Sequence, residues 1–191
     1  MSNINKPKIT DDKIIGGKLN NGIKYILINK KKLERTYVSI NINVGSFHNP
    51  KDYGGLAHFL EHMLFIGSKK YPKPDYFMEE VNKYGGMTNA YTAETFTTYF
   101  FNVLNEGIEH ILDIFSRFFI DPLFDKKYVD KEINAVNNEH LKNIHNDYWC
   151  QDHLLLSLSD KDNRINNFKT GSSNTLNKPD ILEKLMEFYK D

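Results

Sequence analysis

An apolar segment that also carries three titratable side chains constrains the fold of this chain more than any other feature. Between Leu56 and Phe65 the apolar residues recur at helical spacing, and His58, Glu61 and His62 lie among them. The surroundings of these residues are apolar on nearly every side, so the helix is expected to be buried. Burying two imidazoles and a carboxylate costs several kcal/mol unless other groups pair with them. The rest of the chain must therefore bring partners to this helix.

The spacing of the two histidines suits a shared ion. On a helix, His58 and His62 lie about 40° apart around the axis and one turn apart along it, so both imidazoles can reach one metal ion. Glu61 neighbours the same face and can hold a water molecule beside the ion. A catalytic zinc site with an open position needs a third protein ligand. The alternative interpretation of the histidines is a solvated polar face.

A second segment offers the missing ligand. Glu132 and Glu139 are seven residues apart on a predicted long helix, so they share a face among apolar positions. A carboxylate on a buried face needs a cation. Glu139 can bind the metal directly while Glu132 holds one of its ligands. Surface carboxylates on an amphipathic helix are the alternative, and the spacing alone does not decide between the two.

Apolar residues recur at every second position in some segments, as in strands, and at helical spacing in others. Together these two patterns predict an α+β fold. Alternating apolar residues predict a strand over 37–44, and a tight turn at 20–22 precedes a short strand over 23–28. The segment 87–104, rich in Thr, Tyr and Phe, is expected to be a strand or hairpin. Helices are expected over 56–65, 75–84, 106–120, from 125 to at least 149, and from 180 onward. Four aromatic residues are expected in the core: Phe115, Phe118, Phe119 and Trp149.

Composition and charge argue against several classes of protein. The 25 basic and 25 acidic residues give a formal net charge of zero, which argues against a nucleic-acid partner. No apolar run approaches the roughly 18 residues of a membrane span, so no membrane partner is expected. The single cysteine, Cys150, cannot form an internal disulfide and favours a reducing compartment. Residues 1–12 show no secretory or mitochondrial signal, so we expect a flexible lead-in and a cytoplasmic location.

Five motifs in register give the chain a family resemblance. The order His58-Phe59-Leu60-Glu61-His62 is the H-x-x-E-H motif of the inverzincins. Its flanks and three later segments follow the same family pattern: Gly54–Ala57, Met63–Pro72, Asn89–Thr92, Asp121–Phe124 and Glu132–His140. From about Gly17 to its C-terminus, the chain resembles the insulinase/pitrilysin family of zinc metallopeptidases. The resemblance is greater to the branch of insulin-degrading enzyme and nardilysin than to mitochondrial processing peptidase.

The resemblance implies an activity and a set of catalytic roles. The activity is that of a zinc-dependent metalloendopeptidase, a hydrolase that cleaves peptides with one Zn²⁺ per chain. The implied metal ligands are His58, His62 and Glu139. Glu61 is the implied general base, which activates a zinc-bound water, and Glu132 is the carboxylate that supports the site.

The same resemblance implies where a peptide substrate binds. Asn89 and Ala90 fall on an edge strand that pairs with extended peptides. Phe65 is placed to line the pocket for the residue that follows the scissile bond. Substrates would then be chosen by their shape and exposure.

Members of this branch are much longer proteins, with several homologous domains around a closed chamber. The resemblance therefore implies that residues 13–191 are the N-terminal part of the zinc-binding catalytic domain, a largely antiparallel sheet with helices packed on it. We expect this domain to be incomplete, truncated before its last strands. The missing remainder of the polypeptide, or a partner half, would supply further groups near the substrate carbonyl. An unpaired sheet edge also predicts that the fragment self-associates.

Three other functions stay open. A non-hydrolytic zinc-binding fragment would keep the metal without turning over peptides. A catalytically inactive structural relative is expected to lose a ligand or Glu61, but all of these residues are present. A mitochondrial-type processing peptidase subunit would need an import signal, which residues 1–12 do not show. Peptide turnover with added zinc separates the first of these from an enzyme.

Overall fold

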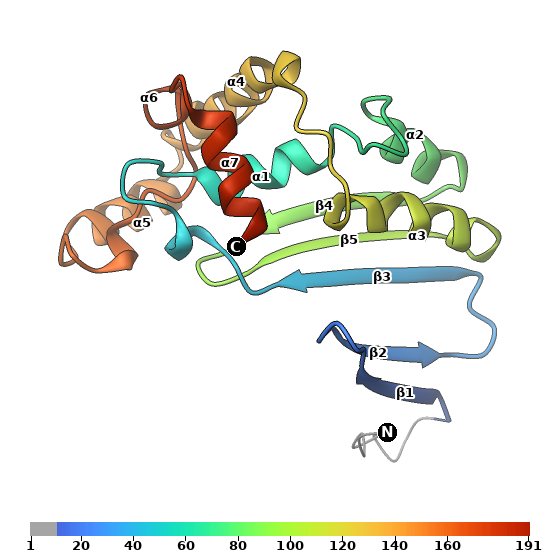
Figure 1. Cartoon of the computed structure of the whole chain (residues 1–191). Coiled ribbons are helices and arrows are strands. Elements are labelled where there is room, and N and C mark those ends of the chain that lie inside the picture. Colours follow the sequence, from blue (N-terminus) through green and yellow to red (C-terminus); the bar gives the residue numbers. More distant parts are fainter. Residues whose placement is uncertain (1–10) are drawn as a thin grey trace.

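A three-stranded antiparallel sheet crosses the middle of the molecule in the view of Figure 1. The chain is described by a computed structural model over residues 11–191, so the lead-in expected over 1–12 lies almost wholly outside the described residues. The strand order is β3-β5-β4, with bounds Arg35–Ile42, Thr97–Leu104 and Met87–Thr92. Within the described residues β4 pairs with β5 alone. The other edge of β4 is therefore free to bind an extended chain.

The alternation of apolar and polar residues predicted for the strand over 37–44 is present in β3. Along β3, the partly buried Val38, Ile40 and Ile42 alternate with exposed residues. The segment expected to be a strand or hairpin is a hairpin, since β4 and β5 pair from Met87↔Asn102 to Thr92↔Thr97. The buried residues of β5 that join the core are Tyr99, Phe101 and Val103.

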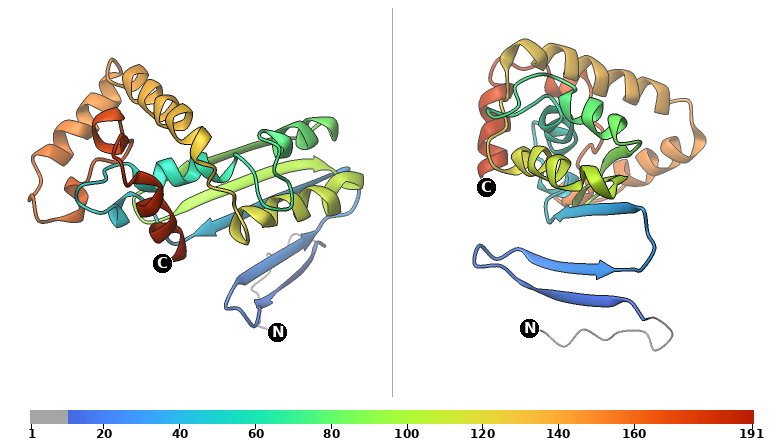
Figure 2. Two further views of the ribbon diagram at one scale, coloured as in Figure 1. Left: turned by 45° about the horizontal axis from the view of Figure 1, so that its top comes forward. Right: turned by 90° about the vertical axis from the view of Figure 1, so that its right-hand side faces the viewer.

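A separate two-stranded sheet precedes the main one. Strands β1 (Lys13–Lys18) and β2 (Lys24–Asn29) form an antiparallel hairpin, and its turn contains Gly22 at φ 93°. The strand expected over 23–28 is confirmed as β2, whereas β1 was not predicted. Every residue of β2 is exposed. Figures 1 and 2 show this hairpin set apart from the helices, at the far side of β3.

The helices pack together on the other side of the molecule from the hairpin (Figure 2). Helix α1 contacts β4 and α4, and α2 contacts β4, β5 and α3. Their bounds are Leu56–Leu64 (α1), Tyr76–Lys83 (α2), Ile108–Ser116 (α3) and Lys126–Asn143 (α4). Two further helices, Ser173–Leu176 (α6) and Ile181–Lys190 (α7), pack against α4 and α1 respectively. Helices over an antiparallel sheet confirm the predicted α+β class.

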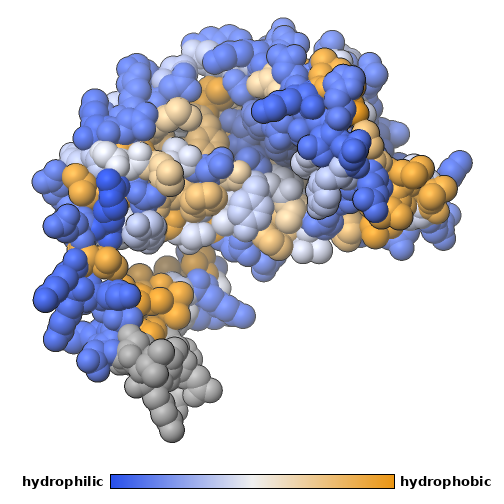
Figure 3. Space-filling model, turned by 180° about the vertical axis from the view of Figure 1, so that it is seen from behind, coloured by the Kyte–Doolittle hydropathy of each residue, from blue (hydrophilic) through white to orange (hydrophobic). Residues whose placement is uncertain are grey.

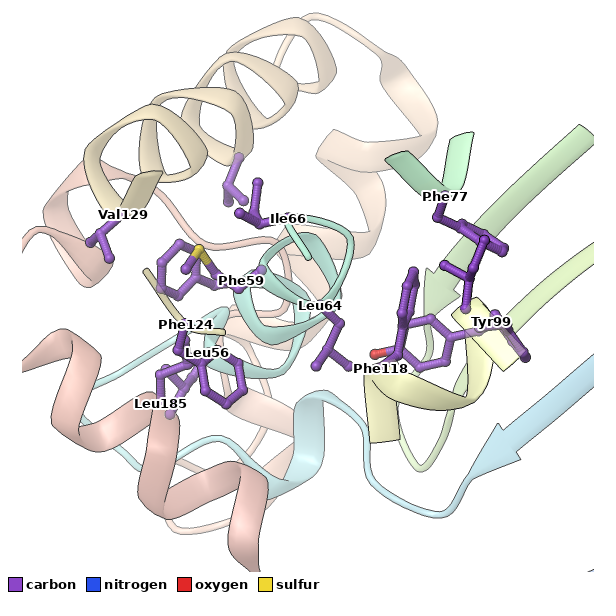
Figure 4. Packing of buried hydrophobic residues seen from close by; sticks show 14 of the residues in the cluster. Leu56, Phe59, Leu64, Ile66, Phe77, Tyr99, Phe118, Phe124, Val129 and Leu185 are labelled. Carbon is purple, nitrogen blue, oxygen red and sulfur yellow. The ribbon is translucent and has the colours of Figure 1, made fainter. Parts of the chain in front are cut away.

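The core is centred on α1 (Figure 4). Leu56, Phe59 and Met63 are completely buried, so the apolar stripe read from the sequence is the packing face of this helix. Around it, side chains from α2, α3, β5 and α7 fill the interior. Phe115 and Phe118 are buried and Phe119 is partly buried, as predicted.

The long helix expected to run to at least residue 149 is interrupted. Helix α4 ends at Asn143, and α5 (Asp147–Ser157) begins after Asn146, whose side chain accepts a hydrogen bond from the backbone N–H of Tyr148. The interruption turns α5 away from α4 (Figure 1), and none of the residues of α5 is buried. Among the described residues, no helix combines the length and apolarity needed to cross a membrane.

Candidate metal centre

The two histidines of α1 lie side by side. The ring centroids of His58 and His62 are 4.8 Å apart, with the ring planes at 81°. The start of the helix is held by Asn49, whose side-chain oxygen accepts a hydrogen bond from the backbone N–H of Ala57 at 2.8 Å. Gly55 precedes the helix with φ 87°, a left-handed conformation that suits glycine. These contacts fix the first turn and with it the imidazole of His58.

Helix α4 brings a carboxylate to the same point. Glu139 Oε2 lies 3.4 Å from His58 Nε2 and 3.8 Å from His62 Nε2. The ligand atoms of these three residues all lie within 4.8 Å of one another. Ligands about 2.0–2.1 Å from a tetrahedral zinc ion stand about 3.3–3.4 Å apart. The donor set therefore fits a zinc ion, and it leaves a fourth position for another ligand.

Both imidazoles are oriented through their second nitrogen. His58 Nδ1 donates to the backbone carbonyl of Thr170 at 2.7 Å, and His62 Nδ1 donates to Glu132 Oε2 at 3.3 Å. These contacts engage Nδ1 of each ring, so Nε2 is the nitrogen that faces Glu139 and the position a metal would take. Glu132 is buried, at 8% exposure. The structure thus places Glu132 behind His62, where the sequence predicts a supporting carboxylate.

Electrostatics at this point favour a cation. Burial lowers the pKa of His62, but hydrogen bonds to Glu132 and Glu139, with the charge of Glu61, raise it to about 9. Hydrogen bonds with the imidazoles of His58 and His62 hold the pKa of Glu139 far below its ordinary value. A positive charge among these carboxylates is strongly stabilised, whether it is a proton or a metal ion.

Glu61 stands next to the cluster on the same helix. Its exposure is 8%, and burial raises its pKa, an effect that a hydrogen bond from Thr92 and the charges of His58 and His62 partly offset. Thr92 Oγ1 donates to Glu61 Oε2 at 2.6 Å. A buried carboxylate with a raised pKa beside an open metal position suits proton transfer to and from water.

A cleft of about 780 Å³ opens over the cluster. Strand β4 forms one wall, and the residues predicted to bind peptide, Asn89, Ala90 and Phe65, all line the cleft. Asn89 is exposed on the free edge strand. The ring of Phe65 packs against Phe118, with the centroids 5.0 Å apart. The structure therefore brings every predicted site residue to one cleft.

Three further contributors were not predicted as part of the site. Thr170 enters through its backbone carbonyl, which no side-chain pattern can reveal. Thr92 lies two residues after Ala90 on β4, so strand alternation alone could have placed it on the same face. Trp149 was predicted to be a core residue, and this was wrong: it is half-buried and lines the cleft from α5, because the interruption before α5 removes it from the core.

Comparison with known families decides the classification. Residues 24–162 match the family described as Insulinase (Peptidase family M16). The chain belongs to the insulinase family of peptidases. The matched residues include the whole candidate metal centre: His58, Glu61, His62, Glu132 and Glu139.

Curated relatives and a solved structure agree with this classification. The chain is 41% identical over 179 residues to the A-factor-processing enzyme of Saccharomyces cerevisiae, which covers 91% of this chain and 17% of the relative. It is 37% identical over 180 residues to human insulin-degrading enzyme, covering 91% of this chain and 18% of that protein. Its fold matches the crystal structure of pitrilysin with a TM-score of 0.94 at 30% identity, over 98% of this chain and 20% of pitrilysin. The chain thus spans about a fifth or less of the length of these proteins.

Proposed function

We propose that this chain is the zinc-binding catalytic part of a metalloendopeptidase. The observation that carries the proposal is the convergence of His58, His62 and Glu139 at one point of a cleft, with Glu61 beside them. Membership of a peptidase family supports it. The proposed cofactor is one Zn²⁺ per chain, and the proposed location is the cytoplasm.

The chemistry divides between the metal and the side chains around it. Bound zinc supplies a Lewis acid that polarises a peptide carbonyl and lowers the pKa of water. Glu61 takes a proton from the attacking water and returns it to the leaving amine. Glu132 and the carbonyl of Thr170 keep the histidine Nε2 atoms turned toward the metal position.

The free edge of β4 supports an extended peptide as the substrate. A peptide that adds to this edge as a further strand would form backbone hydrogen bonds with the segment that contains Asn89 and Ala90. That pairing would place its backbone in the same cleft as Glu61. Phe65 offers an apolar surface for the side chain after the scissile bond. The remainder of the polypeptide, as in the longer relatives, is proposed to complete the chamber and the carbonyl-binding groups.

Metal analysis tests the proposed ligand set. The Glu139→Gln variant is compared with the parent chain and with Glu183→Gln, a matched change at an exposed residue of α7. We expect one zinc per parent chain, the same for Glu183→Gln, and a tenfold to hundredfold lower zinc affinity for Glu139→Gln. Unchanged zinc binding in Glu139→Gln would remove this residue from the site.

A further inference from the structure

The hydrogen bond between Thr92 and Glu61 joins the proposed general base to the proposed peptide-binding strand. We propose that Thr92 is a positioning residue: its hydroxyl holds the Glu61 carboxylate in the orientation needed for proton transfer and ties it to the edge strand β4. This inference rests on the proposed function, in which Glu61 is the base. Thr92 ends the Asn89–Thr92 segment, in which the family resemblance assigns a role only to Asn89 and Ala90.

The Glu61 carboxylate has a single hydrogen-bond donor among the described residues. Thr92 Oγ1 donates to its Oε2 at 2.6 Å, and the other oxygen receives no protein donor there. Glu61 is 8% exposed, so solvent offers few competing donors. An ionised carboxylate buried to this degree depends strongly on each donor it keeps. The donor hydroxyl therefore determines where one carboxylate oxygen lies and leaves the other for the reaction.

The position of Thr92 is itself fixed by its neighbours. It is the last residue of β4 and pairs with Thr97 of β5. Thr97 is buried, and its hydroxyl donates to the carbonyl of Val44 at 2.8 Å. The turn that follows is closed by a hydrogen bond from the backbone N–H of Ala93 to Phe96 at 2.8 Å. Since a β-branched side chain has few χ1 rotamers, this backbone restricts the hydroxyl to a narrow range of positions.

The same strand carries the proposed substrate contacts. Thr88, Ala90 and Thr92 alternate with exposed residues, so they share the face of β4 that is turned inward. A peptide paired with the edge of β4 would be held by the backbone that also carries the Thr92 hydroxyl. Base and substrate then share one rigid support, and their relative position does not depend on a flexible loop. A misplacement of about 1 Å at such a site can lower a rate about a hundredfold.

The test replaces the hydroxyl without changing the shape of the side chain. In the intact protein that contains this chain, Thr92→Val removes the donor, and Thr92→Ser keeps it. Thr36→Val is the matched control, because Thr36 is also a strand threonine whose hydroxyl donates to a side-chain oxygen, that of Asn105 at 2.8 Å. Thr92→Ala serves as a second donor-free variant if Thr92→Val does not fold.

Three measurements distinguish a positioning role of Thr92 from a general loss of structure. We expect Thr92→Val to bind zinc and peptide as the parent does, with KM within twofold but kcat at least tenfold lower. Thr92→Ser is expected to keep kcat within about threefold, and Thr36→Val to match the parent. In crystal structures of the zinc-loaded proteins, the Glu61 carboxylate is expected to be displaced in Thr92→Val and not in Thr92→Ser.

Two results would overturn the inference. One is a donor-free variant at position 92 with kcat within twofold of the parent, and the other is a Glu61 carboxylate that stays in place without the hydroxyl. A zinc-loaded parent that cleaves no peptide would instead contradict the proposed function. The crystallographic comparison would still test Thr92 in that case, so the two failures are distinguishable.

Discussion

His62 shows how one side chain can take part in both the metal position and its support. Its Nε2 faces Glu139, whereas its Nδ1 is bonded to Glu132. Each carboxylate lies on α4, seven residues from the other, so a single helix supplies both contacts. Proper orientation of His62 therefore depends on how α4 lies across α1.

Substitution of the proposed base separates catalysis from metal binding. Glu61→Gln keeps the size of the side chain and can still accept the hydrogen bond from Thr92, but it cannot take up a proton at neutral pH. We expect kcat for peptide hydrolysis in the intact protein to fall about 10²–10⁴-fold, with zinc content unchanged. Steady-state kinetics with metal analysis measure this. Cleavage at the parental rate would show that another group acts as the base.

The side chains of the centre and the supporting Glu132 could be predicted at this scale, and the supporting carbonyl of Thr170 could not. His58, Glu61 and His62 lie within one helical turn, so their proximity follows from local geometry. The pairing of Glu139 with them depends on the packing of α4 on α1, which the sequence only suggests through an apolar face. Thr170 contributes a carbonyl from a loop 112 residues away, and this contact exists only in the folded chain.

Among the elements, the first turn of α1 and the loop before α6 are in direct backbone contact. A side-chain carbon on Gly55 would lie 2.1 Å from the Cα of Gly171, and both glycines have positive φ, at 87° and 86°. Only glycines allow this approach without displacing the loop. The loop carries the Thr170 carbonyl, so the contact of the two glycines helps to orient His58.

Gly55→Ala tests this contact. The added carbon must displace the backbone of Gly171, and the residue must also keep a left-handed conformation, so we expect the free energy of unfolding to fall by about 2–4 kcal/mol. Gly22→Ala is the matched control, because its φ is 93° but the nearest heavy atom to the new carbon is 3.9 Å away. For the control we expect a loss of about 1 kcal/mol. Urea unfolding curves measure both, and equal losses would contradict the account.

Helices and strands could be predicted from the sequence where the local pattern of apolar residues was strong. The alternation along β3 and the apolar stripe of α1 are local, and both elements were predicted. The helix from 125 was expected to continue through Trp149, because 144–146 contain no Gly or Pro to end it. At the break the Asn146 side chain caps α5, and this local hydrogen bond to the backbone competes with continuation of the helix.

At the scale of the whole molecule, the β1–β2 hairpin exposes a group of apolar side chains. Figure 3 shows hydrophobic side chains gathered on it, below the rest of the molecule. Ile15, Ile26, Leu27 and Ile28 are each more than half exposed. Exposed apolar strands with free edges promote pairing between chains. The α+β class was predictable from periodicity, but this arrangement was not, because β1 alone lacks a clear strand pattern.

A charge on the hairpin tests the expected self-association. Ile28→Lys places an ammonium on β2, where the parent residue is 60% exposed, and we expect it to lower the weight-average mass in sedimentation experiments toward that of the monomer. Leu112→Lys on α3 is the control, since Leu112 is also exposed, at 44%, but lies in a helix. Equal effects of the two changes, or a parent chain that is monomeric, would contradict the prediction.

We propose that side chains from α1 and α4 hold one zinc ion together. Anomalous diffraction at the zinc edge from crystals of the zinc-loaded chain tests it most directly. We expect one strong peak about 2.0–2.2 Å from His58 Nε2, His62 Nε2 and a carboxylate oxygen of Glu139. A peak at another place, or one that leaves Glu139 beyond bonding distance, would contradict it.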